Sequence, residues 1–494
     1  MVPLVYVLDF ILLILFVVRL IYKPSSTKKN LPPSPPKLPV IGNLHQIGPL
    51  LHHSLHSLSR NRGAPVMLIH LGCVPTLVVS SADAAREIMK TNDCLFANRP
   101  NMKAWRGLLC EFKEVSSAPY GEYWRQAKSI MVLHLLSNKK IEAHRQIRGE
   151  EIAIVIDKIN KSQVVNLSDM FVRFTNDVVC RVTFGQTYSE GESGRKFRKM
   201  LDEFFEVLGG LNFEDLIPWL AWVDRLRGYH AKVERVAREM DEFLNGVVEE
   251  RLRDQSKKGG REDFVDMLIK IQKEDKIGVV LDRLAIKALL LDAYTAGTDT
   301  TATVLEWTFT ELLKHPKALK KAQDEVRMVF NGKQQINQED IDNLKYLKAV
   351  FKETLRLHPP IPTLVPRVAS QDVKVMGFDI TKGTRVIVNA WAIARDPKVW
   401  DDANEFRPER FLDCNIDFRG RDFDLIPFGA GRRGCPGVAF AMATNENLLA
   451  NLLHKFDWEL PNGEKEDDLD MNEKPGLTIR KKVPLLAVAT PISF

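Results

Sequence analysis

The sequence predicts a mainly α-helical fold with small β-sheets, of the α+β class, in a single globular domain behind an N-terminal transmembrane helix. Three observations predict it: one long apolar run at the N-terminus, helical periodicity from about residue 50 onward, and a few short β-type segments. Hydrophobic residues make up 45% of the 494 residues and charged residues 27%, which is typical of a globular protein with a large core.

Residues 1–23 are predicted to anchor the chain in a membrane. Val2 to Tyr22 contains eighteen apolar residues out of twenty-one, enough helix to cross about 30 Å of hydrocarbon. A cleaved signal peptide is the alternative, but there is no basic n-region and no small-residue cleavage site after Tyr22. The lysines that follow the run predict a single pass, with the rest of the chain in the cytoplasm.

Residues 24–42 are predicted to form a Pro-rich hinge, and residues 43–494 the catalytic domain. Leu31 to Val40 contains five prolines in ten residues, and proline excludes helix at its own and the preceding position. We therefore expect an extended, stiff spacer; an SH3-type ligand is the alternative.

Beyond the spacer, the pattern predicts helices joined by short strands. The helices include 231–253, 282–315 and 316–330, and the expected strand pairs are 66–71 with 76–79, 373–378 with 385–389, and 477–480 with 484–489.

Composition also excludes some classes of protein. A formal charge of +6 is too mild for a nucleic-acid binder, which would need a basic stripe. The six cysteines include no C-x-x-C pair, so neither a disulfide framework nor a zinc ribbon is expected.

The most specific stretch is Phe428 to Gly437, FGAGRRGCPG, in which glycines surround Cys435. Glycine adopts backbone conformations that other residues resist, so such a loop can wrap closely around a flat ligand and leave N–H groups free for a thiolate sulfur. A bound metal would keep Cys435 deprotonated. The alternative, a Gly-rich turn with an incidental cysteine, fits this spacing poorly.

Ala296 to Thr301, AGTDTT, lies within the long predicted helix that Pro316 follows. Gly297 costs a helix about 1 kcal/mol relative to alanine, and a Thr300 hydroxyl bonded back to the Ala296 carbonyl would bend it. Small residues here would open a groove in the helix; a Thr-rich helix contact is the alternative.

Taken together, these motifs resemble the cytochrome P450 family. FGAGRRGCPG is similar to the family's haem-binding signature, which implies haem b (iron protoporphyrin IX) as cofactor, Cys435 as the proximal iron ligand and Arg433 beside a haem propionate. AGTDTT resembles the oxygen-activation motif, which implies catalytic roles for Thr300, as a hydrogen-bond donor on the oxygen side, and Asp299, as a proton relay from solvent.

Further motifs extend the resemblance over nearly the whole chain. Glu353-x-x-Arg356 followed by FRPERF resembles the family's triad, with Arg410 as third member and a structural role. The stretch WRQAK implies propionate contacts from Trp124 and Arg125, and Arg367 occupies another propionate position. With PPSPPKLPVIGNLHQ and APYGEYWRQ, the chain looks like the plant microsomal branch and is similar to subfamily seventy-one A.

The resemblance implies a haem-thiolate monooxygenase of the endoplasmic reticulum membrane. The sequence contains no G-x-G-x-x-G strand–turn–helix unit for NADPH or flavin, so the resemblance implies that electrons from NADPH come through NADPH–cytochrome P450 reductase. The reductase would dock through basic residues such as Lys128 and Arg432. The other partners would be membrane lipid, O2 and a small lipophilic substrate, with no nucleic acid.

Family resemblance also implies a substrate pocket of largely apolar residues, which favours a terpenoid, coumarin, phenylpropanoid or indolic substrate. The residues singled out are Leu208, Phe213, Ile217, Trp219, Ile361, Leu364 and Val365. Phe213 and Trp219 could equally seat the helix hairpin on the bilayer. Two further alternatives are a haem-thiolate isomerase or dehydratase that works without O2, and a non-catalytic haem-binding protein.

Overall fold

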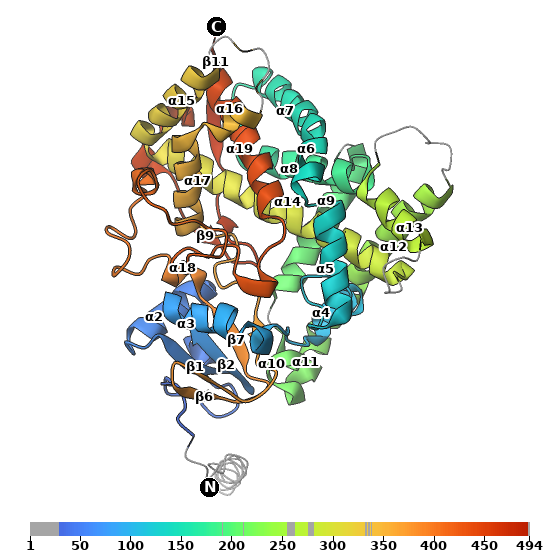
Figure 1. The fold of residues 1–494 in the computed structure, drawn as a ribbon, viewed down its shortest axis with the longest axis vertical. Helices are drawn as coiled ribbons and strands as arrows, with labels where there is room; N and C mark the ends of the chain where they lie inside the picture. The colour runs from blue at the N-terminus through green and yellow to red at the C-terminus, as the bar shows by residue number, and fades with distance from the viewer. Residues whose placement is uncertain are drawn as a thin grey trace, which may run out of the picture.

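The computed structural model describes residues 29–492 except 190, 211, 254–261, 275–280, 331, 332, 334, 335 and 337. Helices form most of this part of the chain, and small sheets lie beside and between them (Figure 1). The predicted class, mainly α with small sheets, is confirmed.

The helices differ greatly in length. They are α2 (Leu51–Arg60), α3 (Ala82–Arg86), α4 (Lys103–Leu108), α5 (Glu122–His134), α6 (Asn138–Ala143), α7 (Arg145–Asn160), α8 (Leu167–Phe184), α9 (Gly191–Gly209), α10 (Phe213–Leu216), α11 (Ala221–Leu226), α12 (Tyr229–Arg253), α13 (Phe264–Glu274), α14 (Arg283–Lys314), α15 (Pro316–Phe330), α16 (Gln338–Asp342), α17 (Lys345–Leu357), α18 (Ala390–Ile393) and α19 (Val438–Lys455).

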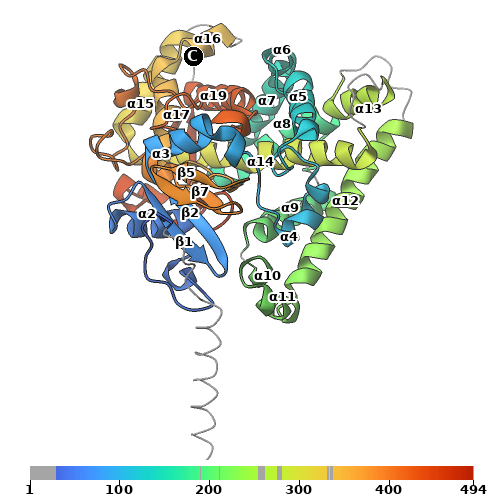
Figure 2. The ribbon, with the colours of Figure 1, turned by 60° about the horizontal axis from the view of Figure 1, so that its bottom comes forward.

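The longest of these helices, α14, crosses the middle of the molecule (Figure 2). The Asp282 side chain caps its first turn by accepting a hydrogen bond from the Ala285 N–H at 2.7 Å. His315 ends the helix and Pro316 begins α15, as the sequence predicts. Almost every side chain of α14 is buried, and the helix packs lengthwise along α8. It is therefore the core helix around which the other elements assemble.

The strands form small sheets. They are β1 (Val66–Leu71), β2 (Val74–Val79), β3 (Val165–Asn166), β4 (Arg367–Val368), β5 (Val373–Val375), β6 (Phe378–Ile380), β7 (Arg385–Val388), β8 (Phe456–Glu459), β9 (Glu473–Lys474), β10 (Arg480–Lys481) and β11 (Leu486–Pro491). The largest has the order β1-β2-β7-β4, and the others pair β3-β11-β8, β9 with β10, and β5 with β6. The β1–β2 hairpin confirms the first predicted strand pair.

The other two predicted strand pairings are wrong. Residues 373–378 do not form one strand against 385–389, because Met376 and Gly377 have φ values of +50° and +81° and turn the chain into the β5–β6 hairpin. Strand β7 pairs with β2 instead, in parallel. Likewise β11 pairs with β8 and β3, while β10 pairs with β9. Short strands carry too little pattern to specify their partner.

The Pro-rich segment is extended, as its prolines predict, and it is bound to the domain. The Leu68 N–H in β1 donates to the Pro33 carbonyl at 2.9 Å, and Asn43 holds Pro36 through a side-chain bond of 3.1 Å. Between residues 29 and 492, the structure describes no helix with the length and hydropathy needed to cross a bilayer. The predicted anchor, residues 1–23, lies outside the described residues.

A buried charge cluster ties α17 to the loop that precedes the cysteine. The Arg356 guanidinium donates to both carboxylate oxygens of Glu353, at 2.7 and 2.8 Å, and the Arg410 Nε donates to the same carboxylate at 3.0 Å. Arg356 also donates to the carbonyl oxygens of Ala394 and Ala403. Neither Glu353 nor Arg356 has any exposed side-chain surface. The triad geometry expected from the sequence is present.

Removing the anion of this cluster should destabilise the fold. Glu353→Ala leaves two arginines buried without their carboxylate, so we expect the free energy of unfolding to fall by about 3–5 kcal/mol. Urea unfolding followed by circular dichroism measures it.

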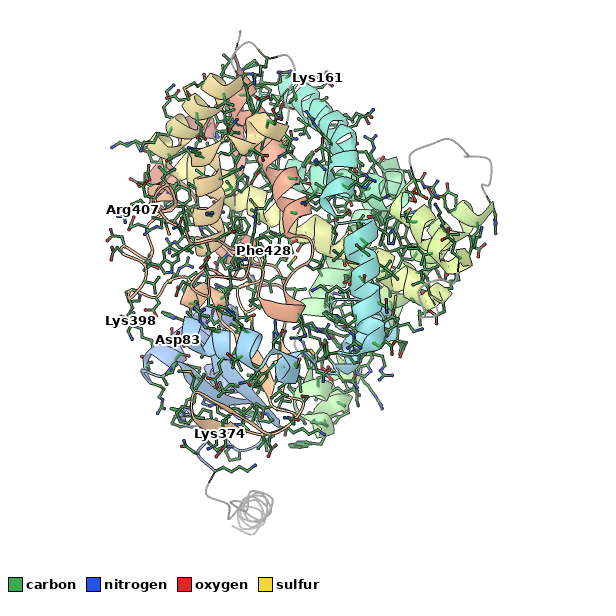
Figure 3. The ribbon with its side chains drawn as sticks, in the orientation of Figure 1. Asp83, Lys161, Lys374, Lys398, Arg407 and Phe428 are labelled. Atoms are coloured by element: carbon green, nitrogen blue, oxygen red, sulfur yellow. The ribbon has the colours of Figure 1, made fainter. Side chains whose placement is uncertain are left out.

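The matched control is Asp157→Ala. Asp157 pairs at 2.6 Å with the exposed Lys161, which is labelled in Figure 3, and exposed pairs contribute only about 0–1 kcal/mol. Equal losses in the two variants would contradict a stabilising role for the triad.

Candidate active site

The Cys435 loop lies immediately before α19, with Phe428 near the centre of the molecule (Figure 3). The Cys435 N–H donates to the Phe428 carbonyl at 2.9 Å, which closes the loop. The Gly437 N–H donates to the Cys435 sulfur, as the sequence predicts for a thiolate cradle. Burial raises the pKa of the Cys435 thiol, and this hydrogen bond opposes the rise.

Gly431 has to be glycine for two reasons. Its φ is +69°, and a Cβ there would lie 2.1 Å from the Met89 carbonyl oxygen. The close approach lets the Asp93 carboxylate accept a hydrogen bond from the Arg432 N–H at 2.9 Å. The loop is therefore held against the segment 89–93.

The Cys435 thiol opens into a cavity of about 270 Å³ between the loop and α14. The walls come from α5, α8, α14, the segment 360–367 and the cysteine loop. Apolar wall residues include Val115, Met131, Val179, Val182, Ala293, Ala296, Ile361, Leu364, Val365 and Phe440. The arrangement brings a soft metal ligand and an apolar chamber together.

Basic side chains gather on one part of the cavity wall. Arg99, Arg367 and Arg433 all line it. Arg99 donates to the carbonyl oxygens of Ser116, Val365 and Pro366 at 2.6–2.9 Å, and Arg433 to those of Ala97, Val115 and Ala118. Only Arg367 reaches a carboxylate directly, that of Asp93 at 3.3 Å. Carbonyl oxygens satisfy the donors but leave most of the positive charge unneutralised.

The pKa values reflect this surplus of charge. Burial, followed by the charges of Arg367 and Arg433, lowers the pKa of Arg99 well below its usual range. Burial and the charge of Arg367 lower the pKa of Arg433 to about 10. Sequence reasoning identified Arg367 and Arg433 but missed Arg99, which belongs to no spacing pattern.

On α5, Trp124 and Lys128 share the face that lines the cavity, since they are four residues apart. The Trp124 ring lies 4.5 Å from the Arg433 guanidinium carbon, and its N–H donates to the Val115 carbonyl at 2.9 Å. The Lys128 ammonium donates to the Arg432 carbonyl at 2.5 Å.

The position of the Arg125 side chain differs from the one expected for a propionate contact. Its side chain is exposed beside Tyr120 and does not line the cavity, because its neighbour Trp124 takes the inward face of α5. Lys128, which the sequence reasoning assigned to partner docking, occupies the wall instead. The i,i+4 spacing from Trp124 was the signal that could have identified it.

Opposite the cysteine loop, Thr300 lines the cavity from α14. Its hydroxyl donates to the Ala296 carbonyl at 2.6 Å, as predicted, while α14 remains one uninterrupted helix. Gly297 also lines the cavity, and a Cβ there would lie 3.1 Å from the Val179 side chain. The glycine therefore lets α8 and α14 approach closely beside the site.

Asp299 points away from the cavity. Its carboxylate accepts a hydrogen bond from the Thr478 hydroxyl and forms an ion pair with Arg480, the first residue of β10. The side chain is 4% exposed. Its predicted role as a proton relay stays a prediction, and these two partners were not foreseen from the sequence.

The expected substrate-pocket residues divide into two groups. Ile361, Leu364 and Val365 line the cavity at Cys435. By contrast, Phe213 and Ile217 pack against the β1–β2 sheet, because α10 turns them onto it. Trp219 is 58% exposed and Leu208 packs on the main core. The segment 208–222 therefore does not form the wall of this cavity.

The chain is similar to known proteins along nearly its whole length. The family model for Cytochrome P450 matches residues 32–487. The chain belongs to the cytochrome P450 family. It is 50% identical to Cytochrome P450 71A6 of Nepeta racemosa over 95% of this chain and 96% of that one. It is 48% identical to tabersonine/lochnericine 19-hydroxylase of Catharanthus roseus over 98% of both. A zebrafish cytochrome P450 solved with progesterone superposes with a TM-score of 0.76, at 26% identity, over 89% of this chain and 99% of that one.

As a P450, the chain is a haem-dependent monooxygenase of a family that contains plant specialised-metabolism hydroxylases, and the residues that line its cavity suit a haem. Cys435 presents sulfur to the chamber, and the three arginines supply the positive charge that two propionate carboxylates require. Binding two buried carboxylates would also relieve the repulsion that lowers the pKa of Arg99.

Two buried acids complete this end of the cavity. The Asp292 carboxylate accepts from the Ser116 N–H at 3.0 Å, and Glu114 accepts from the Ser117 hydroxyl. Burial raises the pKa of both acids, and for Glu114 the Asp292 charge adds to the rise. Asp292, which belongs to α14, holds the segment 114–117 against that helix, and the carbonyl groups of the segment receive Arg99 and Arg433.

The different positions of Lys128 and Arg125 give a direct test. Lys128→Met removes a cation from the cavity wall and, with it, the hydrogen bond that the Lys128 ammonium would donate to a haem propionate. A hydrogen bond to a charged group contributes about 1.5–3 kcal/mol, so we expect haem loss to apomyoglobin to accelerate about 10- to 100-fold. Arg125→Met is the matched control on the same helix and should leave that rate unchanged. The reverse order of the two rates would restore Arg125 as the haem contact.

Proposed function

We propose that this P450 is a membrane-anchored haem-thiolate monooxygenase that inserts one atom of O2 into a small lipophilic plant metabolite of the terpenoid, coumarin, phenylpropanoid or indolic class. The observation that carries the proposal is the juxtaposition of the Cys435 sulfur and the Thr300 hydroxyl across one apolar cavity. The second oxygen atom leaves as water.

Different residues around the cavity have different roles in the proposed reaction. Haem b, when bound, supplies the iron that binds and activates O2. Cys435 provides the thiolate ligand, and the Gly437 N–H stabilises its charge. Arg99, Arg367, Arg433, Trp124 and Lys128 orient the propionate end.

Thr300 lines the same cavity as Cys435, on the side where O2 would bind. Its hydroxyl is the group that can donate a hydrogen bond there. Asp299, one residue earlier on α14, is the proposed link to solvent. Its carboxylate must exchange Arg480 or Thr478 for water when it passes a proton, because both partners occupy its oxygens in this structure.

Three features support a lipophilic substrate. The walls nearest Thr300 are aliphatic, and few polar side chains interrupt them. The zebrafish relative was solved with progesterone, and the Catharanthus relative is named as a hydroxylase of tabersonine and lochnericine. Such a cavity would desolvate the hydroxyls of a sugar or nucleotide without pairing them.

Two partner surfaces follow from the same geometry. Arg125 and Arg432 are exposed beside the Cys435 loop and form a basic approach for NADPH–cytochrome P450 reductase, whereas Lys128 is directed inward. Trp219, Trp222 and Leu226 are 58%, 55% and 79% exposed, which suits contact with the lipid of the endoplasmic reticulum membrane.

Turnover in labelled O2 tests the reaction. With purified reductase, NADPH and a substrate chosen by a type-I spectral shift, we expect one labelled oxygen atom per product molecule by mass spectrometry. A product formed without O2 and without label would instead identify the isomerase or dehydratase alternative, and haem binding without any turnover the non-catalytic one.

Thr300→Ala tests the proposed role of the Thr300 hydroxyl. Removing the hydroxyl should leave haem content unchanged, while NADPH oxidation continues and peroxide replaces product, a loss of coupling of about 10-fold or more. Thr303→Ala is the matched control, because Thr303 makes the same back-bond to the Asp299 carbonyl, at 2.8 Å, away from the cavity. Well-coupled turnover in Thr300→Ala would refute the assigned role.

A further inference from the structure

A second cluster of potential metal ligands lies between α2 and β9, and none of its residues lines the cavity at Cys435. The Nε2 atoms of His52 and His53 lie 2.9 and 3.2 Å from the same Glu473 oxygen. One ligand atom from each of the three residues lies within 4.8 Å of the other two. The residues come from positions about 420 apart in the sequence, so the fold itself assembles the cluster.

The surrounding residues hold these side chains in place. His53 stacks on the Trp391 ring, with centroids 4.6 Å apart, and His52 meets the edge of the same ring at 5.3 Å. The Asn389 side chain donates to the His52 carbonyl at 2.8 Å and fixes the start of α2. His52 is 1% exposed, whereas His53 is 47% exposed. The cluster is therefore rigid on one side and open to solvent on the other.

The donor set has the chemistry of a zinc site. Zinc prefers imidazole nitrogen and carboxylate oxygen at about 2.0–2.2 Å, which places neighbouring ligand atoms of a tetrahedron about 3.3 Å apart. The two nitrogen–oxygen separations in the cluster are close to that edge without any rearrangement.

The composition of the cluster also suits a divalent cation. Two imidazole nitrogens face one carboxylate oxygen, so the three side chains offer two nitrogen donors and one oxygen donor. Among the described residues, two cations lie near the cluster: the Arg395 guanidinium lies over the Trp391 ring at 4.1 Å, and Lys481 in β10 is the cross-strand neighbour of Glu473.

We propose that His52, His53 and Glu473 form a binding site for a divalent transition metal of the zinc type, with water completing the coordination on the His53 side. The site is separate from the haem iron and does not depend on the monooxygenase reaction. His56, four residues after His52 on α2, contacts the Trp391 ring but lies outside the cluster.

The location suggests what such a metal would do. Glu473 belongs to β9, which pairs with β10, and β10 carries the Arg480 that holds Asp299. A metal at Glu473 would cross-link this hairpin to α2 and reduce the opening of the segment 473–481. The proposed role of the metal is therefore structural. A bound metal would restrain the β9–β10 hairpin, which contacts α14 through the Arg480–Asp299 ion pair.

Zinc binding to the haem-loaded protein tests the proposal. The protein is purified with a tag that contains no histidine, and Zn²⁺ is titrated in competition with a chromophoric chelator. We expect one zinc ion bound per chain in wild type, and binding at least about tenfold weaker in His53→Ala and Glu473→Gln. His56→Ala is the matched control on the same helix and should bind as wild type does. Hydrogen exchange of residues 473–481 should slow in the presence of Zn²⁺ in wild type and His56→Ala only.

Two outcomes would overturn the proposal. The first is that wild type binds no zinc at the highest free concentration tested. The second is that His53→Ala and Glu473→Gln bind as tightly as wild type, which would place the metal elsewhere. His53 is half exposed, so its replacement tests the site without loss of the fold. A normal thiolate haem spectrum in each variant confirms that the fold is retained.

Discussion

Buried positive charge is the constraint on which the rest of the active site depends. Arg99, Arg367 and Arg433 converge on one wall of a cavity whose other walls are apolar. Burying such charge costs several kcal/mol per ion unless an anion compensates it. Nearby carboxylates compensate only part of it, and the protein uses main-chain carbonyl groups to hold the guanidinium groups in place. A dianionic cofactor supplies the remainder, which makes haem binding part of the energetics of the folded core.

The features that the sequence predicts well are those encoded over short distances. The cysteine loop, α14 and the Glu353–Arg356 pair each depend on spacings of a few residues, and each is found where expected. Most of the errors concern longer distances. Short strands such as β7 and β11 carry no signal that names a partner, and the arginine at position 99 becomes a wall residue only when distant segments meet.

The contacts of Asp299 show a similar limit. Its place in the AGTDTT motif identifies it as a candidate relay, but its partners come from the hairpin of β9 and β10, far along the chain. Whether a helix residue faces the cavity or a neighbouring strand depends on about 100° of helix rotation per residue, so Thr300 and Asp299 have different surroundings although they are adjacent. The same argument explains why Trp124 and Arg125 differ.

The docking of the Pro-rich segment has a mechanical consequence. The Asn30 N–H donates to the Asp379 carboxylate at 2.8 Å, and the Pro33 carbonyl accepts from Leu68 in β1. From Asn30 onward these residues are therefore fastened to two different sheets, through β6 and β1, and move with the domain as one body. The extended prolines act as a stiff strap between the two sheets.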